Sequence, residues 1–535
     1  MAGQGIGLGP SPTGEHVAFV ATTTNGYGTL HLAPTAAGSA QQLSNNVMFL
    51  HQVGYAFSSD GSWLTFLRDT GTSSNTAESA WLIPVNGGQG RQLGATVARN
   101  HLPRFTPDGQ TVFFVDEAST TTGGRLRRHS TMFGTSTTLA TGVMAFTLAP
   151  QGDQVAFTNN VNLANSTGTL NHYNVNTDDQ YGLGSIKAVQ FHHDGVRFLD
   201  NGTLLFVDNV TADHGTLKTR STNTAIGTLN TNVWVHDIDT SPNAVRISYT
   251  RNGPQAGRYW GALAGGPAVR LGDPVSAFQL FDDDAMVYLN NVMGSPEYGD
   301  LTVVRAGGGS AVLATGVPQP GWLPAQAGRY MTYLANHDFG TGSGTLTRLD
   351  RTNNATQVLD TNAYDLTIWS PDSDHLAYLT AFDAAQDRGT LKVISAVTPG
   401  TPVVLSTSAQ RYFTRMSPIP GRVVFLDNYN AATESGDLTL ANVDGTGRVV
   451  LRTGFHLGNF WVDPLTVKNS DATGRYSVLS DGISSNDIWV LDWQEGVLTH
   501  VGTSVRNMTW AAGTHRLCYT VEEGADQGIW VAQFP

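Results

Sequence analysis

Short runs of alternating apolar and polar residues, each following a tight polar turn, recur along the chain. The clearest run, IWSPDSDHLAYLT, spans Ile368–Thr380. Its second half alternates, so that Leu376 and Tyr378 fall on one face of an extended strand. Ala377 and Leu379 fall on the opposite face. The Ser-Pro-Asp segment favours a turn because proline presets φ and aspartate accepts local backbone hydrogen bonds. The pattern predicts a β-hairpin whose second strand is apolar on both faces, which is typical of a sheet packed between two other sheets.

The same pattern of turn and strand occurs twelve times. The second residue of the turn stands at positions 12, 59, 107, 150, 193, 242, 283, 326, 371, 418, 472 and 512. Successive copies are 40 to 54 residues apart. The copies that begin at Asp282, Ala325 and Asp471 are degenerate, but they keep the spacing. Self-similarity at such a period is the mark of a repeat architecture.

A second signature follows the alternating strand in many copies. It reads Gly-Thr-Leu or Gly-Asp-Leu, and it begins at Gly28, Gly168, Gly215, Gly299, Gly344, Gly389 and Gly436. Each signature opens another short strand, and a glycine-rich turn and a fourth strand usually follow. Four antiparallel strands in about 45 residues, repeated, indicate the blades of a β-propeller. We therefore expect an all-β chain of twelve four-stranded blades.

The turn segments WSPDSDHLAYL, FTPDGQTVFFV and FSSDGSWLTFL resemble the WD40-like, or PD40, repeats of TolB-type β-propellers. The consensus of that family is Trp-Ser-Pro-Asp-Gly followed by an apolar strand. The resemblance covers essentially the whole chain at low identity, and the copies at Ala325 and Asp471 depart from the turn consensus. It implies a TolB-like, extracytoplasmic bacterial protein that is periplasmic, outer-membrane-associated or secreted, with the leader absent from this sequence.

Twelve blades allow two arrangements, because propellers typically have four to eight blades. One is a single twelve-bladed ring over residues 1–535, and the other is two six-bladed propellers over residues 1–273 and 274–535. No linker or change of composition marks AVRLGDPVSAFQLFDD, where the second arrangement needs its boundary. The last copy ends in GIWVAQFP without a fourth strand, and Met1–Ile6 is the free segment that could complete it. We predict one closed ring, with two rings as the alternative.

The composition of the chain limits the classes of binding partner that we expect. Charged residues make up 14% of the 535 residues, and 30 basic residues against 43 acidic ones give a net charge of −13. A nucleic-acid binder needs clustered Lys and Arg, so we expect no nucleic-acid partner and no attraction to anionic membranes. No run of 18 apolar residues is present, which predicts no membrane span. We expect a monomer.

The sequence lacks the common catalytic and cofactor motifs: nucleophile elbow, P-loop, dinucleotide fingerprint, HExxH and EF-hand. We therefore predict no catalytic, cofactor-binding or metal-binding residues and no cofactor. Two clusters are candidate metal sites, His192-His193-Asp194 and Asp282-Asp283-Asp284. Adjacent histidines on an extended chain point to opposite sides, and aspartates at this repeat position favour a polar turn, although Ca²⁺ would suit their oxygen atoms. Both clusters are interpreted as variant turns.

Other conspicuous side chains are assigned to structure. The turn aspartates Asp60, Asp108, Asp194 and Asp372 are expected to cap turns. Aromatic residues precede many turns, where they could line a sugar-stacking surface or form the core between blades: Phe57, Phe105, Phe191, Phe281, Trp369 and Trp510. Their regular spacing favours the core. The single cysteine, Cys518, alternates with apolar residues and is expected to be a buried strand thiol.

The loops between second and third strands are predicted to be the longest and least regular, as in RDTGTSSNTAES, NNVNLANSTG and NHDFGTGSG. Variable loops on a rigid frame are where recognition usually occurs. We therefore expect a non-catalytic binding or scaffold protein that recognises a protein, peptide or glycan on a loop face or channel mouth. The alternatives are a propeller enzyme, a glycan or lactone lyase or hydrolase with its site in the central channel, and a purely structural assembly component.

Overall fold

The computed structural model describes residues 6–535 with gaps. The residues not described are 1–5, 25–26, 37, 49–53, 70–76, 99–101, 120, 163, 165–166, 188–195, 212, 222–225, 273–274, 282–284, 295–296, 306–308, 320–321, 325–328, 371, 373, 457–469, 482–486 and 522–527. In the described part all regular secondary structure is β-strand. The chain divides into two compact units, residues 1–271 with 527–531 and residues 272–526 with 532–535.

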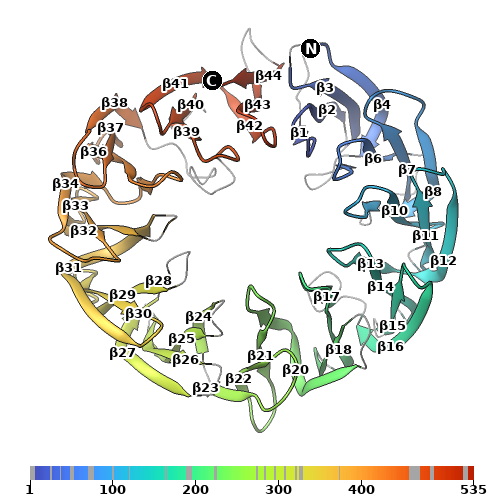
Figure 1. Cartoon of the computed structure of the whole chain (residues 1–535), viewed down its shortest axis with the longest axis horizontal. Coiled ribbons are helices and arrows are strands. Elements are labelled where there is room, and N and C mark those ends of the chain that lie inside the picture. The colour runs from blue at the N-terminus through green and yellow to red at the C-terminus, as the bar shows by residue number, and fades with distance from the viewer. Residues whose placement is uncertain are drawn as a thin grey trace. The chain divides into compact units, whose positions relative to one another are not determined.

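The first unit contains four antiparallel sheets, whose strands follow one another in chain order (Figure 1). The first sheet comprises β1 (Ile6–Pro10), β2 (His16–Thr24), β3 (Tyr27–Pro34), β4 (Gln41–Met48), β5 (Tyr55–Phe57), β6 (Trp63–Arg68), β7 (Ala77–Pro84) and β8 (Arg91–Ala98). The second comprises β9 (Arg104–Phe105), β10 (Thr111–Asp116), β11 (Gly124–Ser130) and β12 (Ser136–Val143). The third comprises β13 (Ala145–Leu148), β14 (Gln154–Asn162), β15 (Thr167–Asn174) and β16 (Asp179–Lys187). The fourth comprises β17 (Val196–Phe198), β18 (Leu204–Thr211), β19 (His214–Arg220), β20 (Gly227–Thr240), β21 (Arg246–Arg251), β22 (Gly257–Ala262) and β23 (Val269–Gly272).

The remaining sheets follow the same antiparallel order. Their first four-stranded sheet comprises β24 (Val275–Leu280), β25 (Met286–Met293), β26 (Tyr298–Val304) and β27 (Ser310–Pro318). A seven-stranded sheet comprises β28 (Trp322–Pro324), β29 (Tyr330–Asp338), β30 (Ser343–Asp350), β31 (Ala355–Trp369), β32 (His375–Asp383), β33 (Arg388–Ser395) and β34 (Val403–Gln410). Next come β35 (Thr414–Met416), β36 (Arg422–Asn430), β37 (Ser435–Asn442) and β38 (Val449–His456). Two three-stranded sheets end the chain: β39 (Tyr476–Asp481), β40 (Asp487–Asp492) and β41 (Val497–Gly502), then β42 (Val505–Trp510), β43 (Arg516–Val521) and β44 (Gly528–Gln533).

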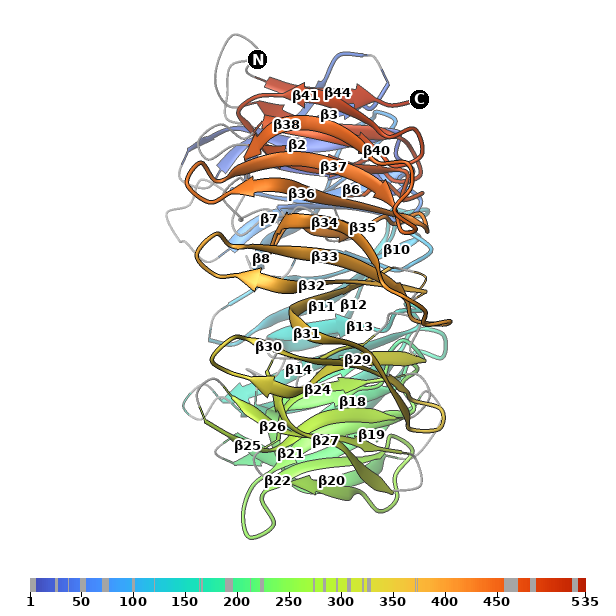
Figure 2. The same ribbon diagram turned by 90° about the vertical axis from the view of Figure 1, so that its left-hand side faces the viewer.

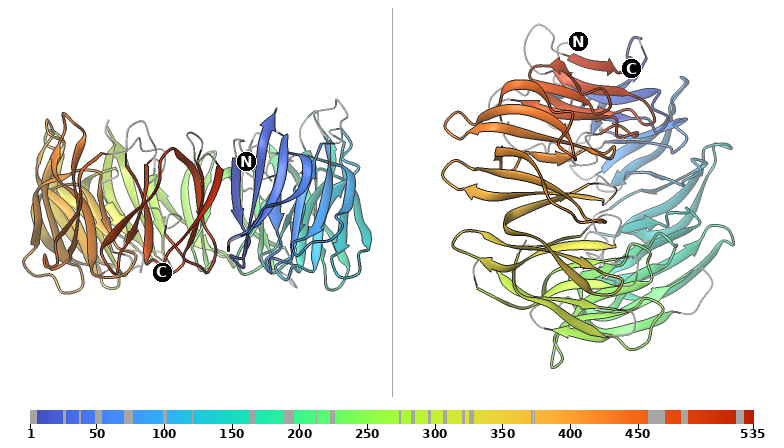
Figure 3. Two further views of the ribbon diagram at one scale, coloured as in Figure 1. Left: turned by 90° about the horizontal axis from the view of Figure 1, so that it is seen from above. Right: turned by 60° about the vertical axis from the view of Figure 1, so that its left-hand side comes forward.

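The sheets are those of an all-β protein made of many small antiparallel units, consistent with propeller blades. In Figure 2, the strands β32 to β34 and β36 to β38 form two neighbouring layers, and the right-hand view of Figure 3 shows the same two layers. Three larger sheets join neighbouring repeats. A single residue pair, Val47 with Arg68, connects β4 to β6. The long strands β20 and β31 each pair with the repeat before them and the repeat after them.

The predicted turn is one recurring hydrogen-bonded structure. The backbone N–H of the first turn residue donates to the carbonyl oxygen of the residue five positions later. The N–H of the residue three positions later donates to the carbonyl oxygen of the first residue. Both bonds form at Ser11, Ser58, Thr106, Ala149, Ser241, Asp471 and Ala511. The degenerate copy at Asp471 therefore forms the same turn as the others. The copies whose turns begin at Asp282 and Ala325 lie outside the described residues.

The preference for Ser or Thr at the first turn position has a physical cause. The buried hydroxyl of Ser58 accepts a hydrogen bond from the Trp63 N–H at 2.9 Å, and Ser370 does the same for His375 at 2.9 Å. In the degenerate copy the Oδ1 atom of Asp471 replaces the hydroxyl. A side-chain oxygen at this position satisfies a backbone donor that would otherwise be buried unpaired.

The sequence placed the fifth turn wrongly. That prediction put it at His192-His193-Asp194, but the hairpin that joins β17 to β18 turns at residues 199–203. There the N–H of Leu199 donates to Thr203 and the N–H of Gly202 donates back to Leu199. The segment His-His-Asp-Gly and the segment Leu-Asp-Asn-Gly both carry turn residues. Strand pairing selects Leu-Asp-Asn-Gly as the turn. A turn at this segment places the buried run Leu204–Val207 between β17 and β19, with which it pairs.

The Gly-Thr-Leu signature is explained by a bulge in the preceding strand. The register of β36 against β37 shifts between Asp427 and Asn430, and Asn428 takes a positive φ of 48°. A β-carbon on Gly436 would lie 2.6 Å from the carbonyl oxygen of Asp427, so only glycine fits. The same contact with a backbone oxygen recurs at Gly168, Gly215, Gly299, Gly344 and Gly389.

This bulge also makes some connecting loops shorter than the sequence pattern predicts. The polar run NNVNLANSTG was interpreted as loop, but β14 continues to Asn162, which pairs with Thr167. Likewise, in NHDFGTGSG, Asp338 pairs with Ser343. The bulge lets pairing resume beyond the irregular residues, so polar residues extend the strands.

The alternating strand β32 is buried on both faces, as the alternation predicts. Ala377 and Leu379 of β32 pack in a cluster with side chains of β33 and β36. Leu376 and Tyr378 pack in a different cluster with side chains of β30 and β31. Burying one large apolar side chain stabilises a fold by about 1.5–3 kcal/mol. The contact between neighbouring sheets is therefore the main apolar core.

Buried acidic side chains add polar contacts between neighbouring sheets. Oδ1 of Asp116, in β10, accepts a hydrogen bond from the Ala95 N–H of β8 at 3.0 Å. Oδ1 of Asp481, in β39, accepts one from the His456 N–H of β38 at 2.9 Å. The carboxylate of Asp427, in β36, accepts a hydrogen bond from the Ser406 hydroxyl of β34. Each of these acids stands at or near the end of the alternating strand and contacts the outer strand of the preceding sheet.

The first and last sheets bear on how the chain would close. Ile6 pairs with Val20 in the first sheet, so it is already part of β1. Residues 1–5 lie outside the described part. The sheet β42 to β44 has three strands, as the missing fourth strand of GIWVAQFP predicts. Both ring arrangements stay predictions.

Candidate functional site

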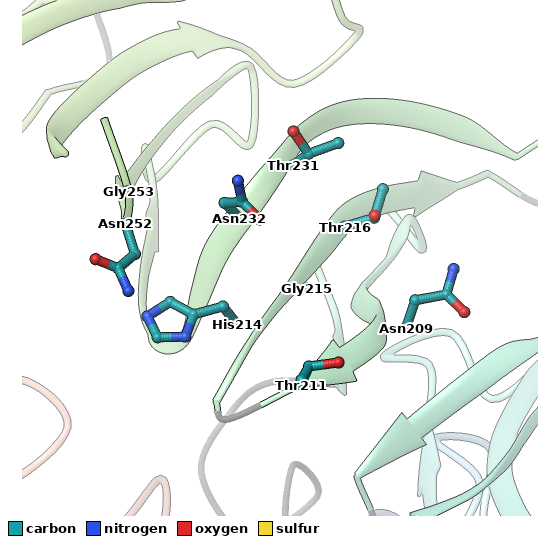
Figure 4. A pocket seen from close by; sticks show the side chains of 9 residues that line it. All are labelled: Asn209, Thr211, His214, Gly215, Thr216, Thr231, Asn232, Asn252 and Gly253. Atoms are coloured by element: carbon teal, nitrogen blue, oxygen red, sulfur yellow. The ribbon is translucent and has the colours of Figure 1, made fainter. Parts of the chain in front are cut away.

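A polar pocket opens in the fourth sheet of the first unit, where the strands β18 to β21 run side by side (Figure 4). Its volume is about 370 Å³. The residues that line it are Asn209, Thr211, His214, Gly215, Thr216, Thr231, Asn232, Asn252 and Gly253. All of them are uncharged residue types or histidine. The lining thus combines carboxamides, hydroxyls and one imidazole.

Two bulges form the pocket. In β18, Asp208 pairs with Thr216 and Thr211 pairs with His214, so Asn209 falls between paired positions. In β20, Val233 pairs with Gly215 and Asn230 pairs with Leu217, so the register shifts a second time.

Both bulges carry an asparagine in the left-handed region. Asn209 has a φ of 53° and Asn232 a φ of 57°. Asparagine enters this region at a smaller cost than most residues that bear a β-carbon. The backbone bends that create the pocket therefore also place two carboxamides at its lining.

Side chains within the bulges hold the backbone in place. Oδ1 of Asp208 accepts a hydrogen bond from the Asn209 N–H at 2.7 Å. Oδ1 of Asn230 accepts one from the Thr231 N–H at 2.9 Å. The Asn252 N–H donates to the Asn232 carbonyl at 2.9 Å, which fixes the next strand. The shape of the pocket is therefore set by the fold.

One lining residue, His214, belongs to an aromatic pair. The rings of His214 and Trp234 lie edge to face, with their centroids 4.1 Å apart and an interplanar angle of 61°. These two residues are opposite each other in the β19–β20 ladder. Trp234 is 37% exposed, although large aromatic residues are usually well buried. The Nε2 atom of His214 is buried and has no hydrogen-bond partner among the described residues.

Of the charged groups close to the pocket in sequence, Lys218 and Asp208 form an ion pair, whereas Arg251 has neutral hydrogen-bond partners and Asp213 directly precedes His214. Lys218 and Asp208 form an ion pair at 2.5 Å, and the Asp208 side chain is 4% exposed. The guanidinium of Arg251 donates from Nε to the Thr231 carbonyl at 3.1 Å and lies over the Tyr259 ring. Since none of these charges lines the pocket, the arrangement is suited to binding a neutral ligand through hydrogen bonds.

The turn aspartates have the structural role expected from the sequence. Asp60 accepts hydrogen bonds from the Ser58 hydroxyl at 2.5 Å and the Ser62 N–H at 3.1 Å. Burial alone would raise the pKa of Asp60, but these hydrogen bonds outweigh it and lower the pKa. Asp108 and Asp372 accept the equivalent pair of bonds in their turns. Asp194 lies outside the described residues.

The two clusters weighed as metal sites, 192–194 and 282–284, also lie outside the described residues. Within the described part of the chain, no group of three or more His, Cys, Asp or Glu side chains is placed to hold a metal ion. In the same part, no helix has the length and hydropathy needed to cross a membrane.

The aromatic residues before the turns pack in cores wherever their side chains are described. Phe57 and Phe105 pack against two clusters in the first unit, and Phe281 and Trp510 are buried members of two clusters in the second. Cys518 is fully buried in β43, as predicted. Burial raises the pKa of its thiol to about 11.

Of the residues that line the pocket, the sequence pattern marks only Gly215 and Thr216, which belong to a Gly-Thr-Leu signature. A further signal is an asparagine on each side of that signature, Asn209 before it and Asn232 after it. Nothing in the sequence shows that the two bulges face one pocket, because this depends on the pairing of β18, β19 and β20.

No family model matches the chain, and no curated protein matches it. Among solved structures, the chain is similar to a eukaryotic initiation factor with a TM-score of 0.34 and 13% identity, over 76% of this chain and 89% of that one. It is similar to the β-propeller domain of the trilobed protease from Pyrococcus furiosus with a TM-score of 0.29 and 11% identity, over 57% and 97%. It is also similar to a protein from Agrobacterium tumefaciens assigned to TolB, with a TM-score of 0.25 and 11% identity, over 50% and 80%. At these TM-scores the likenesses carry no argument for function.

Proposed function

We propose that this chain is a non-catalytic binding or scaffold protein that recognises a protein, peptide or glycan ligand. The observation that carries the proposal is the pocket at Asn209 and Asn232, whose lining offers hydrogen-bond donors and acceptors on a backbone fixed by the sheet. Recognition surfaces on repeat proteins are typically built this way, with variable residues on a regular frame.

The architecture proposed for this function is a TolB-like, twelve-bladed propeller closed as a single ring, extracytoplasmic in a bacterium and monomeric. Two features support it: the turn that recurs at near-constant spacing, and antiparallel sheets whose strands follow chain order. Electron microscopy of the purified chain tests the ring. One disc with twelve repeats supports it, whereas two linked discs of six repeats contradict it.

The test of function is a binding screen with the intact chain. The immobilised protein is exposed to glycan and peptide arrays and to a periplasmic extract, and every captured ligand is confirmed by calorimetry. We expect saturable binding of at least one ligand that is recovered chemically unchanged. Conversion of a captured glycan or lactone, followed by mass spectrometry, would contradict a non-catalytic role.

A further inference from the structure

The pocket between β18 and β21 has the chemistry of a site for a neutral, hydroxyl-rich ligand. We propose that it binds a neutral saccharide of one or two sugar rings. This inference rests on the proposed binding function and deepens it by naming the ligand class and the residues that hold the ligand.

The first argument is charge. Among the residues that the structure describes, no Asp, Glu, Lys or Arg lines the pocket. Lys218 is paired with Asp208, and Arg251 is held by the Thr231 carbonyl and by Gln255. An anionic or cationic ligand would lose water without gaining a partner of opposite charge, which is unfavourable. A neutral ligand avoids this cost.

The second argument is hydrogen bonding. Each carboxamide of Asn209, Asn232 and Asn252 can donate and accept, and so can each threonine hydroxyl. A sugar hydroxyl also does both, so neighbouring hydroxyls match such a lining. The buried Nε2 atom of His214 has no partner among the described residues, and buried polar atoms are normally hydrogen-bonded. His214 itself lines the pocket, so its imidazole adds one more polar group to the lining.

The third argument is shape. His214, which lines the pocket, packs against the ring of Trp234, and Trp234 is 37% exposed. The C–H faces of a sugar ring are apolar and pack well on aromatic side chains, while its edge carries the hydroxyls. A volume of about 370 Å³ is near the lower end of ligand pockets, which span about 300–1,000 Å³. One or two rings suit this size better than a long polymer.

A peptide fits the lining less well. Peptide recognition uses an unpaired strand edge or apolar pockets for side-chain anchors. Here β18 to β21 are paired to their neighbours on both sides, and no large aliphatic residue lines the pocket. The same observations therefore favour a saccharide over a peptide.

The test is ligand-observed saturation-transfer NMR and calorimetry with the full chain. The probes are the methyl glycosides of glucose, galactose and mannose, together with maltose and cellobiose. Galacturonate and glucosamine are the charged comparison ligands. We expect at least one neutral probe to bind, and both charged sugars to bind at least tenfold more weakly.

Substitutions at the pocket test whether the sugar binds there and not elsewhere on the chain. Asn209→Gly and Asn232→Gly keep the left-handed backbone but remove the carboxamide, and His214→Phe keeps a ring but removes both nitrogens. Each is expected to weaken binding by at least tenfold. The matched control is Asn362→Gly, because Asn362 has a φ of 55° at the equivalent bulge of β31 against β30. It should change affinity by less than twofold.

Three results would overturn the saccharide site. The first is that neutral sugars bind Asn232→Gly and His214→Phe as well as they bind the wild type. The second is that charged and neutral sugars bind equally well. The third is that a peptide or protein binds while no neutral sugar does. The third result leaves the proposed function standing. Failure of the chain to bind any ligand class overturns both.

Discussion

The carboxylate of Asp116 fills the space in which a side chain at Gly94 would lie. A β-carbon on Gly94 would come within 2.6 Å of the Asp116 Oδ1 atom, and the next backbone N–H, that of Ala95, donates to that oxygen at 3.0 Å. Gly184 has the same relation to Asp208 in the third and fourth sheets. A glycine on an outer strand and an acid on the next sheet thus form one contact.

This contact predicts a non-additive pair of substitutions. Gly94→Ala should lower the free energy of unfolding by about 1–3 kcal/mol through overpacking. Asp116→Ala should lower it by about 1 kcal/mol, because it removes the hydrogen bond that the Ala95 N–H donates to the carboxylate. In the Asp116→Ala background, Gly94→Ala should cost less than in the wild type, because the clash with the carboxylate is gone and only the contact with Val97 at 3.0 Å is left. Urea denaturation of the four proteins measures the cycle, and strictly additive costs would contradict the contact.

The glycine of the Gly-Thr-Leu signature predicts a site-specific loss of stability. Gly436→Ala places a methyl group against the Asp427 carbonyl oxygen, and backbone atoms cannot move aside as a flexible side chain can. We expect the midpoint of urea denaturation to fall, corresponding to a loss of about 2 kcal/mol in the free energy of unfolding. Gly400→Ala is the control, since a β-carbon there meets nothing within 4 Å. Equal effects of the two substitutions would rule out the close approach.

The ion pair of Asp350 with Arg329 predicts a pH-dependent contribution to stability. Burial alone would raise the pKa of Asp350, but hydrogen bonds from Arg329 and Thr352 outweigh it and lower the pKa to about 2. The folded pKa is thus below the ordinary value of 3.8, so the contribution is present above about pH 4 and is lost as pH falls toward 2. Asp350→Asn should lower the thermal midpoint at pH 6, and its difference from wild type should shrink toward pH 2. A difference that stays constant across this range would show that the charge plays no part.

The buried thiol of Cys518 predicts slow modification of the native protein. Its side chain is fully buried and burial raises its pKa to about 11, so little thiolate is present or accessible at pH 8. We expect iodoacetamide to leave Cys518 unmodified in the native protein and to alkylate it fully in 8 M urea, as measured by mass spectrometry. Rapid alkylation without denaturant would contradict the burial.

Much of the fold follows from local rules that a sequence displays. Where a turn begins with Ser, Thr or Asp, as at Ser58, Thr106 and Asp471, the side-chain oxygen of that residue accepts a hydrogen bond from the backbone N–H five residues later. Alternation in β32 places Leu376 and Leu379 in different cores. The fifth turn was misplaced because two turn-forming segments lie close together, and only pairing between β17 and β18 selects residues 199–203.

The repeat, the turn, the strand order and the burial of Cys518 follow from the sequence alone, because each depends on residues near one another along the chain. Which glycine contacts which acid, and which asparagines share a pocket, depends on how the strands pair and the sheets pack. Asp116 meets Gly94 across two sheets, and Asn209 and Asn232 line one pocket through two bulges on either side of β19. These relations arise from strand pairing and sheet packing, whose partners are set by burial over the whole unit.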